Sequence, residues 1–124
     1  MRFTALLSLA LVALAGLATS ARPALAQQGA IAYDQNNCAW GASWNYADQA
    51  QAQAKAMAEC NHAGCRVLAQ IGPNQCGALA ATPNCKGWGW ATRPTRAAAE
   101  LGAMEECQGA NSGQCTVRVS DCDR

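Results

Sequence analysis

Hydrophobic and polar positions follow the same order twice between residues 29 and 122. In the first copy, two apolar runs at 29–33 and 38–44 flank a cluster of turn-forming residues. An alanine-rich stretch with helical spacing follows Asp48, a residue that favours helix N-caps. Residues 65–71 then alternate between apolar and polar, which is typical of a half-buried strand. The pattern predicts a strand, a strand, a helix and a strand in each copy.

Short motifs confirm that the second copy repeats the first in sequence. They recur in the same order at offsets of 46 to 50 residues, so a chance origin is a poor explanation. We expect half one at 29–76, half two at 77–122, and an α+β fold in which about six strands pack with two helices. The repeated motifs are Gly-Ala-Ile-Ala at 29–32 and Gly-Ala-Leu-Ala at 77–80, Met-Ala-Glu-Cys at 57–60 and Met-Glu-Glu-Cys at 104–107, and Cys-Arg-Val at 65–67 and Cys-Thr-Val at 115–117.

One face of each predicted helix carries equivalent apolar residues, and we expect these faces to be buried in a shared two-layer core. Residues 67, 69 and 71 are apolar and alternate with polar ones, so we expect them to share one face of the last strand. The helix stripes are Ala50, Ala54 and Met57 in the first copy and Ala97, Leu101 and Met104 in the second.

The first 26 residues predict a signal peptide. Arg2 precedes an apolar run from Ala5 to Ala18, which is too short to span a membrane, and small residues precede a cleavage site after Ala26. Removal would leave residues 27–124 as a single duplicated domain, exported to the periplasm or outside the cell, with no membrane insertion. Its formal charge would be near −1, which gives no electrostatic case for nucleic-acid binding.

The cysteines predict a disulfide framework. An even number in an exported domain of this size is typical of cross-linking. The sequence contains no Cys-x-x-Cys, and His62 is the only histidine, so we expect no metal and no cofactor. The eight cysteines are Cys38, Cys60, Cys65, Cys76, Cys85, Cys107, Cys115 and Cys122.

The duplication suggests how these cysteines pair. Two pairs would each span a turn between a helix and the next strand, and two would join equivalent positions of the halves across a pseudo-twofold axis. The main rival is pairing within a half, such as Cys38–Cys76. The pairs we expect are Cys60–Cys65, Cys107–Cys115, Cys38–Cys85 and Cys76–Cys122.

The strand starts, the Trp-Gly motifs, the alanine-rich helices ending in Glu-Cys and the Cys-Gly-Ala at 76–78 together resemble the domain of unknown function 4189 family. The resemblance covers roughly residues 29–122. It implies an exported bacterial protein, because members are typically exported bacterial proteins, including mycobacterial ones linked with host interaction. It implies no established activity and no catalytic residues. Cys38 and Cys85 look like additions to the commoner six-cysteine pattern of the family.

The tryptophans are the candidate binding residues. They lie in pairs on the second predicted strand of each half. The two rings of a pair share one face of the strand, where they could bind sugars, peptides or an apolar partner. The alternative is that they fill the core beneath small alanine-rich helices, because tryptophan is highly buried on average. The four are Trp40, Trp44, Trp88 and Trp90.

No catalytic constellation is visible in the sequence. A catalytic His62 would need a nucleophile and an orienting acid, and every cysteine has an expected partner. The sequence therefore predicts a non-enzymatic interaction module that binds an unknown protein or glycan in the envelope or outside the cell. The alternatives are an inhibitor or immunity-type protein acting on an envelope enzyme, and a small envelope hydrolase.

Overall fold

The computed structural model describes residues 27–110 and 113–124, so the predicted signal segment, 1–26, lies outside the described residues. Within the described residues no helix is both long and apolar enough to cross a membrane. The elements are β1 (Gln28–Asp34), β2 (Ala39–Tyr46), α1 (Gln49–Cys60), β3 (Arg66–Ile71), β4 (Cys76–Ala81), β5 (Trp88–Arg93), α2 (Arg96–Ala110) and β6 (Thr116–Cys122).

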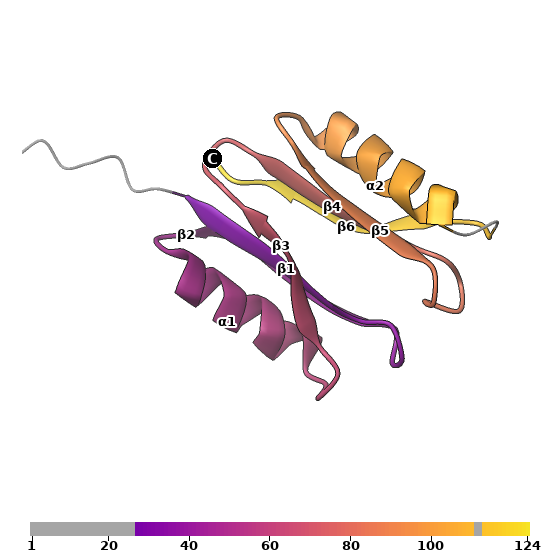
Figure 1. Ribbon diagram of the computed structural model, residues 1–124. Coiled ribbons are helices and arrows are strands. Elements are labelled where there is room, and N and C mark those ends of the chain that lie inside the picture. The colour runs from indigo at the N-terminus through magenta and orange to yellow at the C-terminus, as the bar shows by residue number, and fades with distance from the viewer. Residues whose placement is uncertain (1–26, 111–112) are drawn as a thin grey trace, which may run out of the picture.

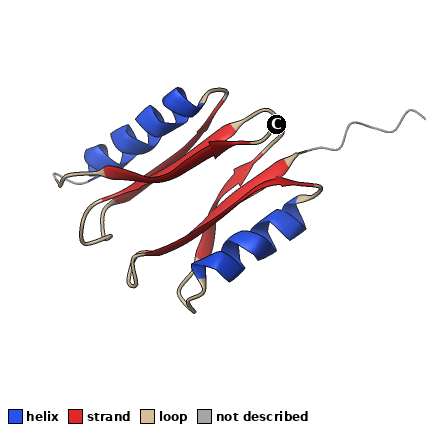
Figure 2. Ribbon diagram, turned by 180° about the vertical axis from the view of Figure 1, so that it is seen from behind, coloured by secondary structure: helices blue, strands red, loops and turns tan. Residues whose placement is uncertain are grey.

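The chain forms two β-β-α-β units, each with a three-stranded antiparallel sheet. The strand orders are β2-β1-β3 in the first unit and β5-β4-β6 in the second. The two sheets face each other, and each helix covers the outer face of its own sheet (Figures 1 and 2). The contacts between the sheets follow the duplication. Strand β3 of the first unit contacts β5 of the second, and the equivalents of these two strands, β6 and β2, also contact each other. The duplicated α+β fold is therefore confirmed.

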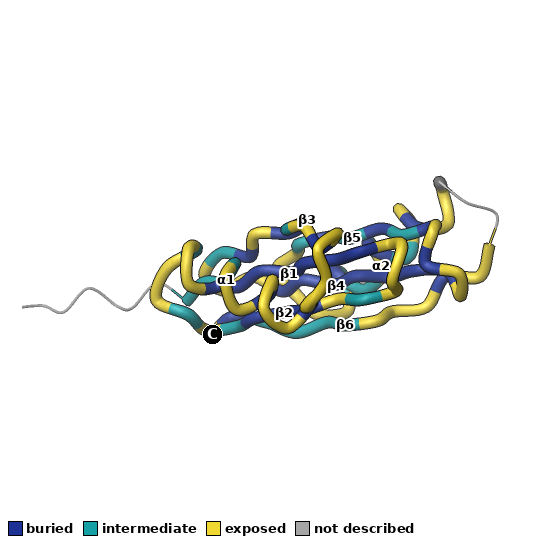
Figure 3. The backbone as a smooth tube through the Cα atoms, turned by 90° about the horizontal axis from the view of Figure 1, so that it is seen from below, coloured by how far each residue is buried: buried dark blue, intermediate teal, exposed yellow. Residues whose placement is uncertain are grey.

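The arrangement has four layers in the order helix, sheet, sheet, helix, and the predicted two-layer core is wrong. The central strands β1 and β4 are buried along nearly their whole length (Figure 3). In β1, Ile31 and Tyr33 face the opposite sheet, whereas Ala30 and Ala32 lie under α1. A strand buried on both faces is a continuous apolar run, and such a run needs a layer on each side.

The buried faces of the helices are not the predicted ones. Leu101 is 61% exposed and Met57 is 37% exposed, and Ala50, Ala54 and Ala97 are also exposed. The helices instead bury a stripe of smaller residues against the sheets, and only Met104 of the predicted stripes packs at its edge. The buried stripes are Ala52, Ala56 and Cys60 in α1, and Ala99, Ala103 and Cys107 in α2.

Two glycines explain why small residues face the sheets. A Cβ at Gly41 would lie 2.0 Å from the carbonyl oxygen of Ala56, and one at Gly89 would lie 2.4 Å from the backbone nitrogen of Cys107. The helix backbone therefore touches the strand backbone at these points, and a Met or Leu side chain has no room between them.

A β-bulge in β3 interrupts the predicted alternation, and β6 of the second unit has one at the equivalent place. Ile31 pairs with Ala69 and Ala32 pairs with Val67, so Leu68 is the extra residue. Ala69 and Ile71 consequently face the opposite sheet, and Val67 packs on the helix side. The prediction that all three share one face is wrong, because a bulge reverses the pattern beyond it.

Every cysteine is in a disulfide, with the pairs Cys38–Cys85, Cys60–Cys65, Cys76–Cys122 and Cys107–Cys115. These are the expected pairs, but one of the reasons given for them is wrong. Cys76 begins β4 and lies opposite Cys122 on the adjacent strand of the same sheet, so this disulfide lies within the second unit. The predicted division after residue 76 is corrected accordingly. Cys38–Cys85 alone among the four joins the two units, through their hairpin turns.

Candidate functional site

A pocket of about 160 Å³ opens where the β1–β2 turn of the first unit meets β5 of the second. The first unit supplies the end of β1, the turn after it, the loop before β3 and the first residue of β3. The second unit supplies one tryptophan. The lining residues are Tyr33, Asp34, Gln35, Asn36, Gly64, Arg66 and Trp88.

Trp88 is held by three residues of the opposite unit. Its ring meets Tyr33 in an edge-on arrangement, with 6.0 Å between the ring centroids. Its indole Nε1 donates a hydrogen bond of 3.0 Å to Gln35 Oε1. The guanidinium carbon of Arg66 lies over the ring, 5.6 Å from the centroid, at cation–π distance. These contacts fix both the indole and the Arg66 side chain.

Tyr33 ties the pocket to the disulfide that joins the units. Its hydroxyl donates a buried hydrogen bond of 2.7 Å to the carbonyl oxygen of Cys85. Burial raises the pKa of Tyr33 above its ordinary value, with a smaller opposing influence from Arg118. The hydroxyl therefore stays protonated at neutral pH, and its proton is committed to Cys85.

Asp34 is a buried carboxylate at the base of the turn. Its Oδ2 accepts a hydrogen bond of 2.6 Å from Asn37 Nδ2, and its Oδ1 accepts one of 2.9 Å from the Asn36 backbone. The Asn37 bond is the largest cause that lowers the pKa of Asp34, so the group is ionised at neutral pH. A Cβ at Gly64 would lie 2.7 Å from Oδ2, so glycine is needed for this close approach.

The four tryptophans do not form one binding surface. Trp44 and Trp90 are partly buried and pack, like Trp88, against the core between the sheets. Trp40 is 40% exposed on β2 and does not line the pocket. Of the candidate residues, Trp88 alone reaches the pocket, so the sequence missed its other lining groups. A signal for them lies in the differences between the copies, because the positions equivalent to Tyr33 and Arg66 are alanine and threonine in the second.

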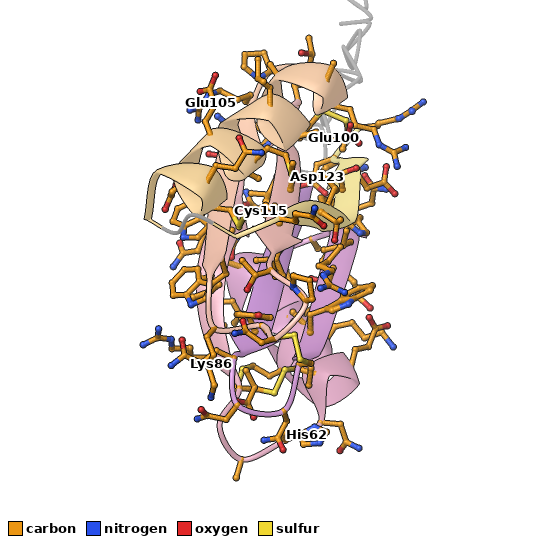
Figure 4. The ribbon with its side chains drawn as sticks, turned by 90° about the vertical axis from the view of Figure 1, so that its right-hand side faces the viewer. His62, Lys86, Glu100, Glu105, Cys115 and Asp123 are labelled. Carbon is orange, nitrogen blue, oxygen red and sulfur yellow. A yellow bond between two sulfur atoms is a disulfide. The ribbon has the colours of Figure 1, made fainter. Side chains whose placement is uncertain are left out.

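His62 lies near the same end of the molecule as Lys86, as Figure 4 shows. Its side chain is exposed, and Nδ1 lies 3.1 Å from the carbonyl oxygen of Cys60. In the part of the chain that the structure describes, no three His, Cys, Asp or Glu side chains are grouped so that they would hold a metal ion.

A second buried carboxylate, Asp123, lies away from Lys86 and His62 (Figure 4). Its Oδ1 accepts a hydrogen bond of 2.8 Å from the Asn45 backbone, and its Oδ2 has no partner among the described residues. Burial raises the pKa of Asp123 above its ordinary value. The folded protein therefore holds this proton more tightly than the unfolded chain does.

We predict that Asp123→Asn raises the free energy of unfolding at pH 7. The contribution of Asp123 to the free energy of unfolding is fully present below the pKa that this group has in the unfolded chain. It is lost as the pH rises through the higher pKa that the group has in the folded protein. The neutral amide avoids this loss, so the advantage of the variant should shrink as the pH falls toward 4. Urea unfolding of both proteins from pH 4 to 7 measures the difference. An advantage that grows on acidification would contradict the assignment.

Comparison with known proteins gives relatives but no activity. Three mycobacterial proteins, Protein Mb1300c of Mycobacterium bovis and Proteins MT1307 and Rv1269c of Mycobacterium tuberculosis, are each 40% identical over 81 residues. The match covers 65% of this chain and 61% of each relative. The solved NMR structure of Rv1813c from Mycobacterium tuberculosis is similar with a TM-score of 0.59 and 25% identity, over 98% of this chain and 97% of that one.

The family profile covers both units and all four disulfides. It matches residues 28–122, which run from the first residue of β1 to the last residue of β6. Since the match takes in every helix and strand described above, the chain belongs to the family described as Domain of unknown function (DUF4189).

Proposed function

We propose that this protein is a non-enzymatic interaction module, exported to the periplasm or the medium, that binds a protein or glycan partner at the pocket between the two units. The proposal rests on the side chain of Arg66, which is held in place but has unused hydrogen-bond donors. Its guanidinium is exposed and held over Trp88, yet no acceptor among the described residues takes a hydrogen bond from it. A fixed cation with free donors in a pocket is suited to recognition.

The polar groups of the pocket support binding over catalysis. The Tyr33 proton is committed to the Cys85 carbonyl, and both oxygens of Asp34 accept hydrogen bonds within the turn. Neither group is free to move a proton to a substrate. His62 faces a backbone carbonyl and lies outside the pocket lining.

The cross-links support the proposed location. All eight cysteines are paired, and such a density of disulfides persists in oxidising compartments. A cross-linked scaffold also keeps a binding site preorganised, which lowers the entropy lost when a partner binds.

Arg66→Gln tests the proposal. Oxidised protein comprising residues 27–124 is immobilised and exposed to envelope and culture-medium fractions, and the bound material is quantified. Loss of a charged hydrogen bond costs about 1.5–3 kcal/mol, so we expect recovery of the partner to fall roughly tenfold or more.

The matched control is Arg93→Gln, which removes another exposed arginine whose hydrogen bond goes to the neighbouring Thr92 carbonyl. Thermal unfolding of both variants should match the parent protein. Equal recovery with Arg66→Gln and the parent would exclude the pocket as the binding site.

A further inference from the structure

The rim of the pocket presents hydrogen-bond donors and few acceptors. The oxygen of the Gln35 amide accepts from the Trp88 indole at 3.0 Å, and that of Asn36 accepts from Lys86 Nζ at 2.8 Å. An indole N–H and an ammonium group can only donate. Each amide must therefore turn its oxygen toward its protein partner, which leaves its NH₂ group as a donor at the rim.

Arg66 adds a cationic donor of defined geometry. The guanidinium has five N–H groups in a planar fork that matches the two oxygens of a carboxylate. Among residues 27–110 and 113–124 no ion pair or hydrogen bond engages it, and its position over Trp88 restricts its freedom. A group preorganised in this way loses little entropy when it binds an anion.

The charge near the pocket is positive overall. Arg66 and Lys86 are both exposed there, against the one carboxylate of Asp34. Asp34 is buried, and its oxygens are directed to Asn36 and Asn37. A complementary ligand is therefore rich in acceptors and negatively charged.

We infer that the pocket binds a carboxylate-bearing saccharide unit, an inference that rests on the proposed function. The carboxylate would pair with Arg66, and the ring hydroxyls would accept from the Gln35 and Asn36 amides. A volume of about 160 Å³ suits one sugar ring better than a larger ligand.

The aromatic residues favour a saccharide over a peptide. The Trp88 ring already contacts Tyr33 and Arg66, and Tyr33 is buried, so the pocket offers no open apolar wall for a peptide side chain.

An NMR titration of ¹⁵N-labelled, oxidised protein tests this inference, with glucuronate, glucose and N-acetylalanine as probes. We expect glucuronate to shift the Trp88 indole N–H and the Arg66 Nε–H saturably, while the other two probes at equal concentration do not. Arg66→Gln should weaken glucuronate binding about tenfold or more, and Arg93→Gln should leave it unchanged.

Three results would overturn the inference. They are no saturable shift with glucuronate, a shift by glucose or N-acetylalanine as large as that by glucuronate, and unchanged glucuronate affinity in Arg66→Gln. If any of these occurs while capture of a partner still depends on Arg66, the acidic sugar is rejected and the proposed function stands. If neither glucuronate binding nor partner capture depends on Arg66, both the acidic-sugar inference and the proposed function are rejected.

Discussion

Gly41→Ala and Gly89→Ala are each expected to lower the free energy of unfolding by about 3 kcal/mol, the upper range for forcing atoms into a packed core. The added methyl group at Gly41 would lie 2.0 Å from the Ala56 oxygen, and that at Gly89 would lie 2.6 Å from the Ala103 oxygen. Both neighbours are helix backbone, so relief requires the whole helix to move away from its sheet. Urea unfolding of the oxidised variants measures the loss.

Gly109→Ala is the matched control for these variants. Gly109 lies in α2, and a Cβ there meets nothing within 4 Å. Alanine is the better helix former, so this change should stabilise the protein by about 0.5–1 kcal/mol. If the three variants shift stability alike, close contact between helix and sheet is not what these glycines provide.

Removal of the disulfide between the units, by the double change Cys38→Ala and Cys85→Ala, should cost about 4 kcal/mol in the chain-entropy account. The two cysteines are 47 residues apart, whereas Cys60 and Cys65 are separated by 5. The loop closed by the second pair is short, so its removal should cost only about 2 kcal/mol. Urea unfolding of the two double variants under oxidising conditions compares these costs.

The same comparison probes the pocket. Without Cys38–Cys85 the two hairpin turns lose their covalent link, and the hydrogen bond from Tyr33 to the Cys85 carbonyl should weaken with it. The Trp88 indole N–H signal in the ¹⁵N NMR spectrum should then shift in the Cys38, Cys85 variant and stay as in the parent protein in the Cys60, Cys65 variant. Equal losses in the free energy of unfolding of the two double variants would show that loop length does not govern how much these disulfides stabilise the protein.

The duplication made much of the fold predictable from the sequence. Two copies of each motif identified the same four elements twice and restricted the disulfide pairings. The number of layers was also open to prediction, because the continuous apolar run in β1 requires cover on both faces of a strand. The two-layer interpretation overlooked that requirement.

The buried helix face could not be found from periodicity. Alanine occupies every second position from Ala50 to Ala58, so it occurs on two opposite sides of α1 and no single face stands out. The larger Met57 and Leu101 drew the prediction to the wrong stripe. The deciding factor was the helix-to-sheet distance, which Gly41 and Gly89 set from another part of the chain.

The pocket was hidden for a different reason. Its residues come from the places where the copies differ, whereas the similarities between copies identified the fold. Tyr33 and Arg66 lie 33 residues apart and pair across β1 and β3, but the pocket is formed only when Trp88 of the second unit packs against both. Contact across the two units depends on how the sheets face each other, which local patterns do not specify.

The sheets of the two units pack face to face and bring Trp88 onto the first unit. Nuclear Overhauser effects from the Trp88 ring in oxidised protein test it most directly. We expect cross-peaks to the Tyr33 ring, whose centroid lies 6.0 Å away, and from the indole N–H to the Gln35 side chain. Cross-peaks from the Trp88 ring to α2 of its own unit, with none to Tyr33 or Gln35, would contradict it.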